Sequence, residues 1–135
     1  MSSMNFKSIQ LKYVYFEINS DFIKELNIPI NYDISINNNF NEDTKNLSLD
    51  LTIETPNKEK ANNYPFFFKI TLSGVFEFKE SIEQKLFDSY IKINCPSIMF
   101  PYIRETLADI IRRSGFPPIH LPPINFLKMY EKTSQ

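Results

Sequence analysis

The stretch CPSIMFPYIRETLADIIRRSGFPPIHLPPINFLKMY, residues 95–130, passes from a helical pattern into a proline-rich one. Its first half carries an apolar stripe at the spacing of an amphipathic helix, formed by Ile103, Leu107, Ile110 and Ile111. Gly115 is a natural C′ residue, because glycine adopts positive φ without strain. The prolines in residues 116–124 then exclude a helix and favour a stiff, extended loop. Asn125 can cap a short last helix through its side-chain oxygen.

The helical pattern also extends toward the N-terminus from this stretch. Ser81 and Gln84 form a capping-box pattern, and apolar residues then recur every four positions at Ile82, Leu86 and Tyr90. Pro96 can begin a second helical stretch, whereas Pro101 lacks an amide donor and predicts a kink or a place in the first turn. We therefore predict three elements: a kinked helix over residues 81–115, a crossover loop over 116–124 and a C-terminal helix over 125–133.

The first 80 residues follow a period of two instead. Apolar side chains alternate with polar ones in residues 30–36, 47–54 and 66–78, and residues 6–18 are β-branched and aromatic. This pattern is typical of an antiparallel sheet with one buried and one solvated face. Gly74 replaces an apolar residue on the buried face, which predicts a bend, a bulge or a close backbone approach.

Two polar segments, residues 37–46 and 56–63, are turn-rich and short enough for hairpin loops. The consecutive order of the strands predicts a four-stranded meander, with the sheet in residues 6–79. Strands followed by helices define the α+β class. A length of 135 residues corresponds to a single domain.

The composition excludes several kinds of site. Two glycines are too few for a dinucleotide-binding or P-loop motif. One Cys and one His cannot build a zinc cluster, so we expect neither a metal nor a cofactor. Carboxylates, Lys and Tyr are plentiful, but nothing pairs them as an acid, base or nucleophile, and we therefore predict no enzyme. The 13 Phe, 7 Tyr and 9 Pro are the unusual part of the composition.

Charge and hydropathy favour a protein of the cytoplasm. The net charge of −1 offers no basic surface for nucleic acid. We expect no secretory signal and no membrane insertion, because no basic n-region precedes an apolar run and no run approaches the roughly 20 residues of a span. The single Cys95 fits a reducing compartment, and we interpret it as a small core residue rather than a reactive thiol. We interpret His120 as a loop residue rather than a pH sensor or metal ligand.

Four motifs in residues 95–130 point to a known family. In order, they are Cys95-Pro96, Phe100-Pro101-Tyr102-Ile103-Arg104-Glu105, Gly115-Phe116-Pro117 and Pro123-Ile124-Asn125-Phe126. The order and spacing of these motifs resemble the C-terminal half of the SecB family of export chaperones. Phe16-Glu17 and Gly74-Val75-Phe76 resemble family positions in the strand half.

The resemblance implies a four-stranded sheet backed by a long kinked helix, assembled as a homotetramer, a dimer of dimers. It also implies ATP-independent holding of unfolded preproteins in hydrophobic grooves bounded by the crossover loop, the last helix and the sheet. The client-binding residues carried over are Phe116, Ile119, Leu121, Ile124, Phe126, Met129 and Tyr130. We expect the prolines of the loop to keep its apolar residues out of the chain's own core.

The resemblance further implies contacts with partners. We assign Phe100, Tyr102, Arg104 and Glu105 to helix packing or subunit contacts. On the open sheet face, Glu17 and Phe67 are candidates for a surface that docks the translocation ATPase SecA. Family acids are replaced there by Tyr13 and Lys69, and we expect no acidic C-terminal tail, so the sequence predicts weakened docking to SecA. The alternative is a dedicated chaperone of one client, such as the antitoxin of a toxin–antitoxin system.

Overall fold

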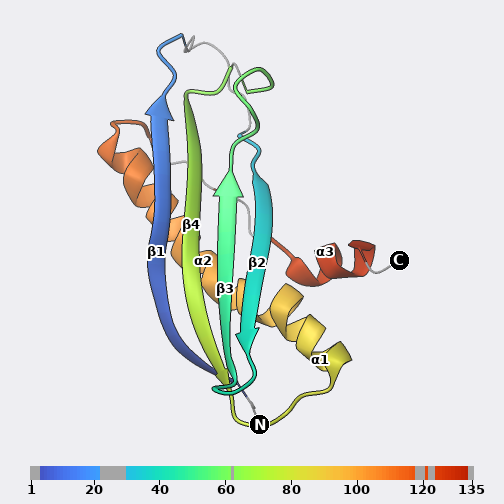
Figure 1. Ribbon diagram of the computed structural model, residues 1–135. Coiled ribbons are helices and arrows are strands. Elements are labelled where there is room, and N and C mark those ends of the chain that lie inside the picture. The colour runs from blue at the N-terminus through green and yellow to red at the C-terminus, as the bar shows by residue number, and fades with distance from the viewer. Residues whose placement is uncertain (1–3, 22–29, 62, 118–120, 122–123, 134–135) are drawn as a thin grey trace.

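The computed structural model describes residues 4–21, 30–61, 63–117, 121 and 124–133. In Figure 1 the helices lie on one side of a four-stranded antiparallel sheet. The strands are β1 (Met4–Ile18), β2 (Asp33–Asn41), β3 (Asn46–Glu54) and β4 (Phe66–Phe78). The helical elements are α1 (Gln84–Ser89), the π-helical turn η1 (Tyr90–Asn94), α2 (Cys95–Arg113) and α3 (Phe126–Thr133). The predicted α+β class and the order of strands before helices are confirmed.

The strand order is β1-β4-β3-β2, so the predicted meander is wrong for the first strand. β2, β3 and β4 pair as successive hairpins, but β1 pairs with β4 and not with β2 (Figure 1). The physical reason is the length of the first connection. Residues 19–32 separate β1 from β2, whereas a hairpin loop needs only about two to five residues. The long connection allows β2 to lie at the opposite edge, which gives a Greek-key arrangement.

The set of β1 residues that faces α2 switches between even and odd positions twice along the strand. Its register against β4 shifts between Phe6 and Ser8, and again between Leu11 and Tyr13. Each shift adds one residue to β1, as in a β-bulge. Apolar side chains therefore reach the face toward α2 from even positions, then odd positions, then even positions again. This explains why the sequence of the strand places apolar residues at both parities.

β2 runs further than the alternation predicts. The predicted strand covered residues 30–36 and the predicted loop 37–46, but the strand continues to Asn41. Its residues 37–41, which are asparagines except for the core-facing Phe40, pair with residues 46–50 of β3 through the backbone. Because β2 is an edge strand, these asparagine-rich positions remain in contact with solvent while their backbone is paired.

The hydrophobic core lies between the sheet and α2. Alternate residues of β3 and β4 are buried, as predicted: Leu47, Leu49, Leu51, Ile53, Phe66, Phe68, Ile70, Leu72, Phe76 and Phe78. From the predicted stripe of α2, Ile103, Leu107 and Ile111 are buried in the same cluster. Gly74 shows no register shift in β4, so the expected close approach is confirmed and the bulge is absent; its neighbour is Met99 of α2.

The helical region begins later than predicted and is interrupted elsewhere. α1 starts at Gln84 with Glu83 as its N-cap and no side-chain cap, so the capping box at Ser81 is wrong. Pro96 lies in the first turn of α2, as predicted, whereas Pro101 lies inside α2. The interruption is the π-helical turn η1, where the Cys95 N–H donates to the Tyr90 carbonyl. Such single π-turns are frequent at functional sites.

Both predicted end signals of the C-terminal region are confirmed. Gly115 follows α2 with a φ of 88°, the left-handed conformation expected of a C′ glycine. The Lys128 N–H donates to Asn125 Oδ1 over 3.0 Å, so Asn125 caps α3. None of the helices in the described part of the chain is long and apolar enough to span a membrane.

Candidate functional site

α3, the edge strand β2 and the turn η1 border an apolar groove of about 270 Å³, which we call the α3 groove. Its lining residues are Ile36 and Asn38 of β2, Ile91 and Lys92 of η1, and Phe126, Met129 and Tyr130 of α3. Five of these seven side chains are aliphatic, thioether or aromatic. Such a lining accepts apolar side chains without demanding a particular hydrogen-bond partner.

α3 is held in place from its first turn. Phe126 is buried, and its ring meets the Phe100 ring edge-on with 5.9 Å between the centroids. The cap from Asn125 fixes the start of the helix. Met129, one turn further, keeps 38% of its surface exposed at the groove. The anchored end of α3 thus supports an accessible apolar wall.

The predicted client-binding residues lie in different environments. Met129 and Tyr130 line the α3 groove, and Phe126 forms its buried edge. Leu121 is only 4% exposed and belongs to the core, so the prediction that the prolines keep this residue out of the core is wrong. The free energy of this aliphatic side chain is lower in the core than in water.

Two further loop residues pack at the margin of the core. Phe116 is half-buried, with its ring 5.4 Å from the Phe66 ring in an edge-on contact. Ile124 is also half-buried against the core cluster. Ile119 and His120 lie outside the described residues, so their predicted roles stay predictions.

Lys92 and Tyr130 face each other across the groove. The Lys92 Nζ lies 5.6 Å from the centroid of the Tyr130 ring, within the range of a cation–π interaction. The contact links η1 to α3 and places a positive charge among apolar side chains. The α3 groove therefore combines hydrophobic walls with one cation.

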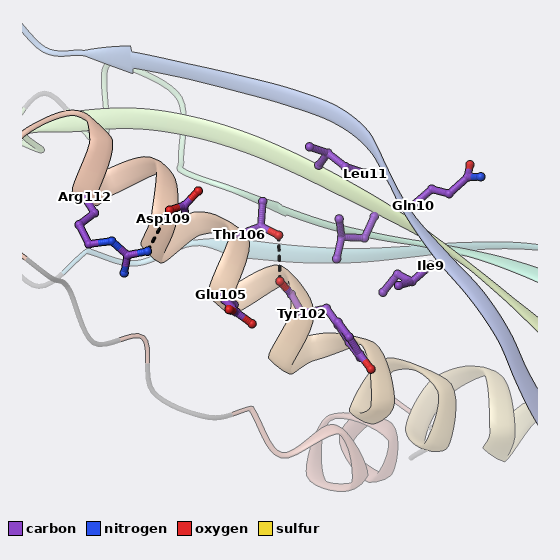
Figure 2. Close-up of a pocket in the computed structure, with 9 residues that line it drawn as sticks. Ile9, Gln10, Leu11, Tyr102, Glu105, Thr106, Asp109 and Arg112 are labelled. Carbon is purple, nitrogen blue, oxygen red and sulfur yellow. Dashed lines mark hydrogen bonds and ion pairs between the residues drawn. The ribbon is translucent and has the colours of Figure 1, made fainter.

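A second groove of about 510 Å³ separates β1 from α2 (Figure 2). Figure 2 shows Ile9 and Leu11 of β1 on one side and Tyr102, Glu105 and Asp109 of α2 on the other. Asp109 accepts hydrogen bonds from Arg113 and from Arg112, and these bonds lower the pKa of its carboxyl. This groove is rimmed by charge and is distinct from the α3 groove.

The residues predicted for helix packing or subunit contacts divide in the same way. Phe100 is buried, and the Arg104 guanidinium lies over its ring at 5.9 Å. Tyr102 and Glu105 are exposed beside the second groove, and the Tyr102 ring lies 6.0 Å from the Phe6 ring of β1. Phe100 and Arg104 therefore pack within the chain, whereas Tyr102 and Glu105 are accessible.

On the open sheet face, Glu17 is exposed as predicted and tied to two neighbours. The Tyr15 hydroxyl donates to Glu17 Oε2 over 2.5 Å, and Lys58 Nζ lies 2.9 Å from Glu17 Oε1. Both hydrogen bonds lower the pKa of the Glu17 carboxyl, and the bond from Tyr15 is the larger cause. The carboxylate is thus already engaged by groups of its own chain.

Phe67 faces the same side as Glu17, but the expectation that it is accessible is wrong. It is 7% exposed and packs with Ala61 and Tyr64 in a small second cluster. The loop between β3 and β4 folds back over this end of the sheet. It is fixed there because the Asn19 side chain donates to the Tyr64 carbonyl over 2.8 Å.

Lysines pair with two further carboxylates of the open face. Lys12 Nζ lies 2.6 Å from Asp50, and Lys7 Nζ lies 3.7 Å from Glu77. Lys69, at a position where the resemblance implies an acid, lies 5.9 Å from the ring centroid of Tyr13. On the open face carboxylates therefore alternate with lysines, and the surface is not purely acidic.

Cys95 is a core residue, as predicted. It is fully buried, and its Sγ lies 3.4 Å from Met4 Sδ. Burial raises the pKa of the thiol to about 12. A thiol in this state is unreactive at neutral pH.

Comparison with known proteins assigns the chain to a family. The sequence model described as "Preprotein translocase subunit SecB" matches residues 2–135. The chain belongs to the SecB family. The resemblance inferred from the four motifs of residues 95–130 is therefore confirmed.

Curated SecB proteins align with part of this SecB-family chain. A protein-export protein SecB of Albidiferax ferrireducens is 36% identical over 86 residues, which cover 64% of this chain and 53% of the relative. One from Burkholderia vietnamiensis is 43% identical over 67 residues, covering 50% and 42%. The chain spans about half the length of the curated relatives it matches.

Solved structures show the same fold at lower identity. A SecB-like chaperone of Mycobacterium tuberculosis, in complex with a ChAD peptide from the HigA1 antitoxin, matches with a TM-score of 0.66 and 14% identity, over 90% of this chain and 91% of that one. A protein of unknown function from Streptococcus agalactiae matches with a TM-score of 0.52 and 12% identity, over 89% and 97%. The first match supports the SecB-like fold.

Sequence reasoning missed four residues of the α3 groove in this SecB-family chain. Ile36, Asn38, Ile91 and Lys92 line it together with the predicted α3 residues. The alternation of the sequence identified Ile36 as an apolar strand position, but it could not show which elements lie across the groove from it. Ile91 and Lys92 lie in η1, and the four-residue spacing used for the helix cannot reveal a π-turn.

Proposed function

We propose that this SecB-family chain is an ATP-independent holding chaperone that binds unfolded polypeptide segments and serves protein export. The observation that carries the proposal is the α3 groove, whose walls are apolar and partly exposed. Membership of the SecB family supports the same role. The protein acts in this proposal by binding and not by catalysis.

The physics of the α3 groove suits many clients. A groove that must accept different sequences cannot rely on demanding polar pairs, because each unmatched buried polar group costs about 1–3 kcal/mol. Apolar walls make no such demand, and a fully buried aliphatic or aromatic side chain contributes roughly 1.5–3 kcal/mol. Met129 adds adaptability, because its unbranched thioether chain fits varied shapes.

An aggregation assay tests the proposal. The protein is mixed at stoichiometric ratio with several unrelated unfolded proteins, without ATP, and light scattering is followed. We expect suppression by the wild type, loss of suppression by Met129→Glu, and retention by Leu127→Glu. Leu127 is exposed on α3 but does not line the groove, so its variant places the same charge on the same helix. Failure of the wild type to protect any client would refute the holding role.

A dedicated one-client chaperone is the second candidate. The observation that favours it is the structural match to a SecB-like chaperone bound to an antitoxin peptide. The same assay separates the two roles. Protection of one polypeptide and no other would favour the dedicated role, and protection of several would favour general holding.

Self-association into a homotetramer, a dimer of dimers, is part of the proposal. β1 leaves a row of apolar side chains exposed on the face toward α2: Phe6, Leu11, Val14 and Ile18. Leu11 alone is 54% exposed, and such a row on an edge strand favours a partner strand or helix. We expect Leu11→Asp to lower the oligomer mass in mass photometry. Ser8→Asp, on the opposite face of β1, should leave it unchanged.

The proposal includes only weak docking to SecA. Three carboxylates of the open face, Glu17, Asp50 and Glu77, are paired with lysines, and Lys69 adds a cation near Tyr13. A basic partner would have to break those pairs. Titration of SecA by calorimetry tests this, and tight binding would contradict it.

The buried thiol of Cys95 fits a reducing compartment, so the proposal places the protein in the cytoplasm.

A further inference from the structure

The α3 groove differs in charge from the other grooves of the described residues. Lys92 is the one charged side chain among its seven lining residues. Three other grooves each carry two carboxylates together with one or two basic side chains; the carboxylates are Glu105 and Asp109 beside β1, Glu42 and Glu80 near α1, and Asp50 and Glu54 on the open face. An extended segment that enters the α3 groove therefore meets a cation and no lining anion.

The position of that cation is set by the fold. Lys92 lies in η1 directly after Ile91, which is buried in the core. Its ammonium lies over the Tyr130 ring, which removes water from one side of the charge. The charged residues of α3 outside the groove lining are Lys128, Glu131 and Lys132, all exposed. A carboxylate on a bound segment can approach Lys92 while neighbouring apolar side chains contact Ile36 and Met129.

Resting on the proposed holding function, we propose that the α3 groove prefers client segments in which an acidic residue adjoins apolar ones, and that Lys92 determines this preference. The preference comes from charge complementarity at the groove, whereas the apolar walls supply most of the affinity. Because the ion pair forms at a partly exposed site, it adds selectivity and little affinity.

Fluorescence anisotropy with three synthetic peptides tests the proposal. The labelled nine-residue peptides share one leucine- and phenylalanine-rich sequence and differ at a single position, which is Asp, Asn or Lys. We expect the wild type to bind the Asp peptide roughly two- to fivefold more tightly than the Asn peptide at low salt. The difference should shrink at about 0.5 M salt, where charges are screened over a few ångströms.

Variants of Lys92 identify the residue responsible. Lys92→Met keeps a long apolar side chain without the charge and should bind the Asp and Asn peptides equally. Lys92→Glu should prefer the Lys peptide. Lys85→Met removes an exposed lysine of α1 that does not line the groove, and it should keep the wild-type preference.

The outcomes separate this inference from the function on which it rests. If all three peptides bind the wild type with equal affinity, the Lys92 preference is refuted and the holding function stands. If Lys92→Met keeps the preference for the Asp peptide, another residue determines it and the inference is overturned. If no peptide binds and no client is protected from aggregation, the proposed function fails as well.

Discussion

Met99 Sδ of α2 lies 2.9 Å from the point that a Cβ on Gly74 of β4 would occupy. The absence of a side chain at Gly74 therefore makes room for the Met99 side chain between α2 and the sheet. Because the neighbouring core is filled, Gly74→Ala should overpack it and destabilise the protein by about 1–3 kcal/mol in urea unfolding.

A double-mutant cycle tests whether Met99 is the cause. Met99→Ala alone should cost about 2–5 kcal/mol through the cavity it leaves. The double variant should be more stable than the sum of the single effects predicts, because each change relieves the other. Ser73→Ala, next in sequence but on the open face, should change stability by less than about 0.5 kcal/mol. Additive effects would contradict the steric explanation.

Asn125 should control the order of α3 and, through it, the groove. Asn125→Ala removes the acceptor for the Lys128 N–H and should destabilise the helix by about 1 kcal/mol. Hydrogen exchange of the α3 amides reports the loss as faster exchange. Asn125→Ser keeps a capping oxygen and should exchange like the wild type. Equal protection in the Ala variant would show that packing of Phe126 alone orders the helix.

The Glu17 carboxyl should titrate below the ordinary range of a glutamate. Hydrogen bonds from Tyr15 and Lys58 lower its pKa in the folded state. The stability they contribute is therefore present above the ordinary glutamate pKa and is lost as pH falls through the lowered folded value. Carbon-13 NMR of the carboxyl should show the titration midpoint rising in Tyr15→Phe and in Lys58→Met. Lys60→Met, on the same loop, should leave the midpoint unchanged.

Cys95 should resist thiol reagents in the folded protein. Burial raises the pKa of its thiol to about 12 from an ordinary value of 9.0. Reaction with Ellman's reagent should be slow until denaturant is added. In a Cys95→Ala background, Ser97→Cys places a thiol at an exposed position of α2 and should react at once. Rapid labelling of native Cys95 would contradict its burial.

The same pKa shift predicts an alkaline loss of stability. Above pH 9 the unfolded chain releases the Cys95 proton, whereas the folded chain keeps it until about pH 12. The stability contributed by the neutral buried thiol is therefore present below pH 9 and decreases as pH rises toward 12. Guanidinium unfolding at several pH values should show a smaller alkaline decrease for Cys95→Ala than for the wild type.

The alternation of polar and apolar residues predicted β3 and β4 well, because one face of each is buried. It could not assign the neighbours of β1. Period two determines which face a side chain occupies and carries no information about which strand lies beside it. The asparagine-rich residues 37–41 were predicted as a loop for a related reason. An edge strand can pair its backbone while its side chains stay in solvent.

The candidate site was predicted in part. Met129 and Tyr130 were found through motif resemblance, and the cap at Asn125 through local chemistry. Lys92 was missed, because its place in the groove depends on η1 and on the packing of α3 beside β2. Leu121 was assigned to the groove by the resemblance and expected to stay out of the core because proline-rich segments are stiff, but stiffness does not prevent a single leucine from reaching the core.

The pairing of β1 with β4 has a consequence for how the chain is made. Residues 4–18 leave the ribosome before the other strands, and their hydrogen-bonding partners begin only at Phe66, about fifty residues later. At roughly 5–20 residues per second, that interval lasts about 2–10 s. During this time the apolar row of β1 has no sheet to join, whereas β2, β3 and β4 can form hairpins as they emerge. By the holding role proposed for it, each newly made copy would for those seconds resemble the clients that finished copies bind.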